Sequence, residues 1–112
     1  MTKFADKIRW RKAVTEHRRR VAQFPENVRS AHRHCSGHRD EILASDTCGC
    51  FYCAAIFPPS RITDWCDEDD QHVGQTALCP ECGIDSVIGD RSGFPITTGF
   101  LSEMKYYWFS DA

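Results

Sequence analysis

Two short cysteine motifs constrain the fold of this chain more than any other feature. Cys50 and Cys53 form one Cys-x-x-Cys pair, and Cys79 and Cys82 form a second pair after 25 intervening residues. Two pairs at this separation can bring four thiolates to one tetrahedral ion, which is the ligand set of structural zinc sites. The spacing therefore predicts a zinc ion bound by Cys50, Cys53, Cys79 and Cys82, with a single iron ion as the alternative.

A metal enclosed by four thiolates has no open position for water or substrate, so we expect a structural site and no catalysis at the metal. The other three cysteines are expected to be structural as well, with Cys48 beside the metal site and Cys35 and Cys66 as packed thiols. Seven is an odd number of cysteines, which argues against a disulfide scaffold and for a reducing, cytoplasmic location. We find neither a signal peptide nor an apolar run of membrane-spanning length, so no membrane partner is expected.

The first 45 residues have the apolar spacing of helices. Trp10, Val14 and Val21 fall along one side of a helix that Pro25 should end. A second helix is expected after Pro25 and should end near Gly37, and a further helical turn is expected over residues 38–44.

Residues 46–96 have the pattern of a zinc ribbon around the two cysteine pairs. Residues 60–65 suit one helical turn capped by Ser60, and the acidic residues 67–70 are expected to form a solvated loop. Residues 77–78 lead into the second cysteine pair and residues 84–88 lead out of it, and they are predicted to form a strand pair, the hairpin expected of a zinc ribbon.

The last segment, residues 97–112, is predicted to be a helix that Thr97 or Thr98 caps. No linker rich in Gly, Ser or Pro separates the basic helical part, residues 1–45, from the rest. We therefore expect a single α+β domain over residues 1–112. Its N-terminal helices should pack on a small zinc-ribbon-like β core, with the C-terminal helix closing over it.

Charge is distributed unevenly along the chain. Residues 1–45 contain eleven Lys and Arg residues against five acids, whereas residues 46–112 contain three basic residues against eleven acids. A basic helix can bind nucleic acid, but it can also dock on an acidic part of its own chain or face water. The candidate phosphate contacts are Arg18, Arg19 and Arg20, together with Arg9, Arg11 and Lys12.

Histidines form the densest cluster of titratable residues. His32, His34 and His38 lie within seven residues, where imidazoles could serve as acid–base groups or ligands. Histidines also fill structural positions, and we expect a structural role here, with a second metal site or a catalytic site as the alternative. Three further candidate binding residues follow the second cysteine pair, and hydrogen bonds within turns would explain them equally well: Asp85, Asp90 and Arg91.

Four segments together resemble a family of small bacterial cytoplasmic proteins of unknown function. They are CGCFYC at 48–53, PxxIxxW at 59–65, TALCPECGIDSVIG at 76–89 and SGFPIT at 92–97. The resemblance extends over roughly residues 32–109. It implies a compact cytoplasmic protein and no particular activity.

These observations favour a zinc-stabilised adaptor that acts through contact with another protein. One alternative is a nucleic-acid-binding module that uses the basic N-terminal helix. Another is a small hydrolase or nuclease that uses the histidine cluster, which is the only basis in the sequence for an enzyme.

Overall fold

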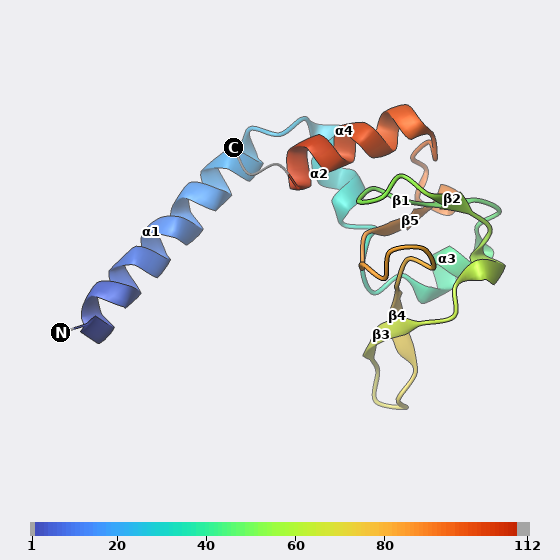
Figure 1. Ribbon diagram of the computed structural model, residues 1–112, viewed down its shortest axis with the longest axis horizontal. Helices are drawn as coiled ribbons and strands as arrows, with labels where there is room; N and C mark the ends of the chain where they lie inside the picture. The colour runs from blue at the N-terminus through green and yellow to red at the C-terminus, as the bar shows by residue number, and fades with distance from the viewer. Residues whose placement is uncertain (1, 110–112) are drawn as a thin grey trace.

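The computed structural model describes residues 2–109, with side chains from residue 10 onward. In this part of the chain, helices surround two small antiparallel sheets (Figure 1), which confirms the predicted α+β class. No helix among the described residues is both long enough and apolar enough to cross a bilayer. The helices are α1 (Thr2–Ala22), α2 (Glu26–His32), α3 (Arg39–Ala44) and α4 (Thr98–Trp108).

The larger sheet has three short strands in the order β2-β1-β5, so that β1 is central. These strands are β1 (Cys48–Cys50), β2 (Ile56–Phe57) and β5 (Val87–Gly89). Because Cys50 is the last residue of β1 and pairs with Val87 of β5, the sheet places the first cysteine motif beside the segment that follows the second.

The smaller sheet is a hairpin of β3 (Trp65–Glu68) and β4 (Gly74–Ala77). β4 ends two residues before Cys79, so the hairpin leads directly into the second cysteine motif. α3 packs against β4 and β5 and so bridges the two sheets, with Ile42 fully buried.

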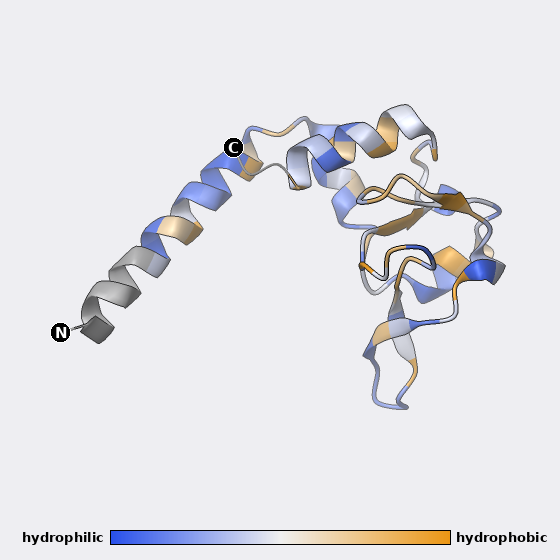
Figure 2. Ribbon diagram, viewed as in Figure 1, coloured by the Kyte–Doolittle hydropathy of each residue, from blue (hydrophilic) through white to orange (hydrophobic). Residues whose placement is uncertain are grey.

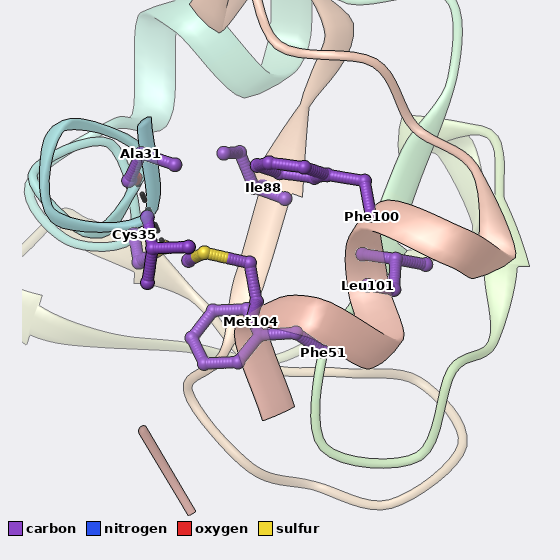
Figure 3. Packing of buried hydrophobic residues seen from close by; sticks show 8 residues of the cluster. Ala31, Cys35, Phe51, Ile88, Phe100, Leu101 and Met104 are labelled. Atoms are coloured by element: carbon purple, nitrogen blue, oxygen red, sulfur yellow. Dashed lines mark hydrogen bonds between the residues drawn. The ribbon is translucent and has the colours of Figure 1, made fainter. Parts of the chain in front are cut away.

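α4 covers a hydrophobic core that it forms with residues of α2 and β5. Phe100, Leu101 and Met104 turn from α4 towards Ile88 of β5 and Ala31 of α2, as Figure 3 shows. Gly49 is required under this helix, because a Cβ atom there would lie 2.8 Å from Leu101 Cδ1. Fully burying one such side chain contributes about 1.5–3 kcal/mol, so this layer is a main source of stability apart from any metal.

α1 projects away from the rest of the molecule (Figure 1), and hydrophilic residues cover most of its described part (Figure 2). Its predicted apolar side is largely uncovered, since Trp10 is 68 % exposed. The chain rejoins the core at Phe24, whose ring lies 5.0 Å from that of Tyr107 and 5.1 Å from that of Trp108. The helices that pack on the β core are therefore α2 and α3.

Several local predictions hold. α1 ends at Ala22 before Pro25. α2, however, ends at His32 with Arg33 as its C-cap, so Gly37 does not end this helix; with a φ of 56°, it lies in the connection to α3. Thr97 caps α4, accepting a hydrogen bond of 3.2 Å from the Phe100 N–H. The prediction also placed residues 110–112 in this helix, and these residues lie outside the described part of the chain.

Others were wrong. The helical turn predicted at 60–65 is a shorter 3-10 turn, Pro59–Arg61, and Ser60 makes no capping bond because the turn begins one residue earlier, after Pro58. Cys66 accordingly lies on a strand. The predicted hairpin of residues 77–78 with residues 84–88 does not form, because Val87–Gly89 pairs with β1.

The acidic loop is also shorter than predicted, because strand β3 includes Asp67 and Glu68. The φ angle of Asp67 is 57°, an unusual conformation for a residue with a side chain. The Asp67 carboxylate accepts a hydrogen bond of 2.7 Å from the Thr76 hydroxyl on β4. This cross-strand bond explains why an acidic residue sits within the hairpin.

Candidate metal centre and surrounding residues

The fold brings together the four cysteines that the spacing singled out. The sulfurs of Cys50, Cys53, Cys79 and Cys82 all lie within 4.8 Å of one another. Two contacts link the motifs, at 3.7 Å between Cys50 and Cys82 and 3.6 Å between Cys53 and Cys79. A tetrahedral ion with bonds of about 2.3 Å to sulfur requires its ligands to be about 3.8 Å apart. The cluster therefore has the dimensions of a tetrahedral four-thiolate site and could hold a metal ion.

Both cysteine motifs have the same backbone turn. The N–H of Cys50 donates to the Ala55 carbonyl and that of Cys79 to the Ile84 carbonyl, each at 2.9 Å. Four residues after its first cysteine, each turn has a residue with positive φ, Ala54 at 66° and Gly83 at 79°. Ala54 therefore adopts the conformation that glycine adopts in the second turn, at a cost of about 1–2 kcal/mol. Ligand geometry imposed on the chain explains why this strain is tolerated.

Backbone N–H groups point at the sulfurs. Tyr52 N–H lies 3.4 Å from Cys50 Sγ, and the N–H groups of Glu81 and Cys82 lie 3.4 and 3.5 Å from Cys79 Sγ. Burial alone would raise the pKa of Cys79, but these donors outweigh burial and lower the pKa below the usual thiol value. At Cys79 the turn thus favours thiolate, the form that binds metal, whereas burial raises the pKa of Cys53 and raises that of Cys82 to about 12.

Ser86 is a neighbour of the metal cluster that sequence reasoning did not assign to it. Its hydroxyl lies 3.2 Å from Cys50 Sγ, and the residue is almost fully buried. No spacing rule places Ser86 there, because the contact depends on the pairing of β1 with β5.

The remaining cysteines are free thiols outside the cluster. Cys35 and Cys48 are buried, and burial raises the pKa of each to about 12, which leaves them protonated and unreactive. Cys66 is half-buried on β3. These positions agree with the structural roles expected from the sequence.

His38 joins the helical part of the chain to the hairpin. Its ring Nδ1–H donates to the His34 carbonyl at 2.6 Å, and Nε2 accepts from the Ala77 N–H at 3.1 Å. The residue is 5 % exposed, and burial lowers the pKa of its imidazole. Since both ring nitrogens are bound to backbone groups, His38 has no nitrogen free for a metal or for acid–base catalysis.

His34 lies beside His38 in a surface pocket of about 330 Å³, where its Nδ1 contacts the Glu41 carboxylate at 2.9 Å. Arg33 and Asp40 also line this pocket. Besides the fully bound His38, the groups in this pocket that could serve acid–base chemistry are the His34 imidazole and the carboxylates of Asp40 and Glu41.

The other candidate binding residues lie in separate places. His32 stacks on Trp108 and, with Asp85, lines a second pocket of about 360 Å³. Asp90 accepts a bond from the Asp46 N–H, and Arg91 binds the Ala44 carbonyl through Nε. Asp90 and Arg91 therefore satisfy backbone groups at the end of α3, and the six candidates do not form one site.

The candidate nucleic-acid contacts lie on the projecting helix. Arg18, Arg19 and Arg20 are exposed on α1, and Arg20 also contacts the ring of His17. Arg11 and Lys12 are exposed on the same helix, whereas the side chain of Arg9 lies outside the described residues.

Comparison with family models, with curated proteins and with solved structures found no significant match to this chain. The site has to be interpreted from its own geometry. That geometry defines a small α+β protein with four cysteines placed to hold one metal ion.

We predict about one zinc ion per chain and its loss on replacing Cys79 by Ser. Metal binding in such domains contributes roughly 10–16 kcal/mol of apparent folding free energy, so the variant should unfold or aggregate. Elemental analysis and circular dichroism test both points, with Cys66→Ser as the matched control that retains metal and fold. A folded Cys79→Ser protein of unchanged metal content would contradict the assignment of this ligand.

We predict that His38→Ala lowers the free energy of unfolding by about 2–4 kcal/mol, because it leaves the buried Ala77 N–H without an acceptor. The lowered pKa of His38 means that the folded state binds fewer protons than the unfolded state. The stabilisation that neutral His38 provides is therefore present above pH 6.5, which is about the pKa of histidine in the unfolded chain. It decreases as the pH falls below that value.

Urea unfolding at pH 7.5 and pH 5.5 measures this dependence. The wild-type protein should lose more stability between the two pH values than the variant does, and exposed His17→Ala should behave as the wild type. Equal losses in the wild type and in His38→Ala would refute a buried neutral His38.

Proposed function

We propose that this protein is a small zinc-stabilised adaptor that binds another protein. The observation that carries the proposal is an exposed aromatic cluster beside the first cysteine motif. Tyr52 and Phe109 are each 39 % exposed, and their rings lie 5.0 Å apart. Exposed aromatic side chains gathered on one surface are typical of protein interfaces.

The metal centre would hold this surface rigid. Tyr52 lies between the ligands Cys50 and Cys53, and its backbone N–H contacts Cys50 Sγ. The ammonium of Lys105 lies 5.3 Å from the centre of the Tyr52 ring, and the ring of Phe51 lies 5.6 Å from that of Phe109. A rigid aromatic surface loses little conformational entropy on binding, which favours affinity.

A pocket adjoins the cluster and would accept a side chain of the partner. It has a volume of about 360 Å³ and is lined by Phe51, Trp108 and Phe109 on its apolar side and by Asp85 and His32 on its polar side. Pockets that receive an anchor residue are where binding energy concentrates at interfaces.

The enzyme alternative has less support, because the four-thiolate cluster has no open position and His38 is fully engaged. A cytoplasmic location belongs to the proposal, since none of the seven cysteines is paired in a disulfide.

We predict that a photo-crosslinking phenylalanine analogue at position 52 captures a discrete protein partner in cells. The same analogue at Val73, an exposed position in the β3–β4 turn, is the control and should capture little. Equal capture at both positions, or only nucleic-acid adducts at position 52, would count against the adaptor function.

A nucleic-acid-binding module is the second candidate, and the arrangement of α1 favours it. α1 projects away from the acidic β3–β4 turn (Figure 1), so that turn does not neutralise the basic residues of α1; Glu16 is the acidic residue among its described side chains. A basic surface free of acidic neighbours is the electrostatic requirement for binding phosphates.

This candidate predicts that affinity for single-stranded RNA falls steeply with salt. Replacing Arg18, Arg19 and Arg20 by Ala should reduce the slope of log affinity against log salt by about 2, since each lost phosphate contact removes about 0.7. Fluorescence anisotropy between 50 and 200 mM salt measures the slope. An unchanged slope in the triple variant would exclude these arginines as phosphate contacts.

A further inference from the structure

A second kind of site lies where α1, α2 and α4 meet. It is a pocket of about 450 Å³, within the usual size range of small-ligand sites. Arg18 of α1 and Arg29 of α2 line it, together with Arg33, the residue directly after α2. The pocket does not contain the metal ligands or Tyr52, and it shares His32 and Trp108 with the 360 Å³ pocket.

The three guanidinium groups lack acidic partners. No Asp or Glu lines the pocket, and none of the three arginines forms an ion pair with a described residue. In addition, Arg29 Nε is buried without a hydrogen-bond partner within the described part of the chain. Arg18 and Arg33 are exposed and Arg29 is half-buried, so the three arginines give the pocket a positive potential that attracts anions.

Two stacked aromatic rings, those of Trp108 and His32, line the pocket and are held in place by their neighbours. Trp108 stacks on His32, with ring centres 3.8 Å apart and planes inclined by 25°. The indole N–H donates to the Val28 carbonyl at 3.3 Å, and the ring of Phe24 packs edge-on against Trp108. Val21 and Ala22 of α1 add apolar surface to the same pocket. Aromatic rings beside arginines suit a planar base joined to a phosphate.

We propose that this pocket binds a nucleoside phosphate, with the phosphate on the arginines and the base against the rings of Trp108 and His32. Guanidinium groups suit this role because their N–H groups form paired hydrogen bonds to phosphate oxygens. The ligand is either a free nucleotide or one nucleotide of a nucleic-acid strand, which share this chemistry. The arginines are not part of the proposed protein-binding surface, although His32 and Trp108 line both pockets, and only Arg18 is shared with the candidate contacts on α1.

Isothermal titration of the metal-loaded protein with AMP, and separately with a ten-nucleotide single-stranded RNA, tests the proposal. We expect at least one probe to bind, and Arg29→Ala and Arg33→Ala each to weaken its binding tenfold or more. Arg19→Ala is the matched control, because it removes the same charge from α1 but does not line the pocket. It should change AMP affinity less than twofold. Circular dichroism checks that each variant is folded.

Arg29→Lys keeps the charge but loses the paired donors, so it should still weaken binding even if Arg29→Ala fails to fold. Binding of AMP with this variant pattern identifies a free nucleotide as the ligand. Binding of RNA alone, with the Arg29 and Arg33 variants weakened far more than Arg61→Ala, a control outside both the pocket and the candidate contacts on α1, identifies a strand. No binding of either probe at millimolar concentration overturns the proposal. Equal weakening by Arg33→Ala and its control, Arg19→Ala for AMP or Arg61→Ala for RNA, also overturns it. Neither result bears on photo-crosslinking at position 52.

Discussion

The convergence of four cysteine sulfurs is the constraint on which the rest of this structure depends. Its strands have only two to four residues, too few for backbone hydrogen bonds alone to hold two sheets together. The cysteine turns join the end of β1 to the segment between β4 and β5, and a bound ion would fix both segments at one point. The strained conformation of Ala54 is consistent with that dominance, because the turn keeps its shape without glycine.

The helical part of the chain is attached to this centre by polar contacts as well as by apolar packing. His38 binds β4 through its backbone N–H, which donates to Gln75, and through its ring, which accepts from Ala77. Arg39 extends the attachment, since it donates to the Gly74 carbonyl and lies over the ring of Trp65. Two consecutive residues thus fasten the start of α3 to the hairpin. The histidine cluster suggested chemistry in the sequence, but its member His38 makes hydrogen bonds to β4 of the kind that a neighbouring strand would make.

Local patterns in the sequence predicted what depends on local chemistry. The spacing of Cys50 and Cys53 identified a metal motif, and Thr97 marked the start of α4, because ligand turns and helix caps involve neighbouring residues. The partner of β5 could not be predicted, since it lies about 40 residues earlier in β1. The same limit applies to Ser86, and to the pocket formed when α2 and α4 bring Arg29 and Trp108 together.

The position of α1 has an electrostatic consequence for the whole molecule. The helix is about 30 Å long, so its outer turns are several Debye lengths from the core at physiological salt. Its basic residues and the acidic β3–β4 turn therefore form separate poles of a molecule that measures 52 × 35 × 21 Å. The electric field of a charged partner orients a protein with such a charge dipole before the two molecules make contact. An anionic partner would meet α1 first, and association would be faster than the net charge of −2 suggests.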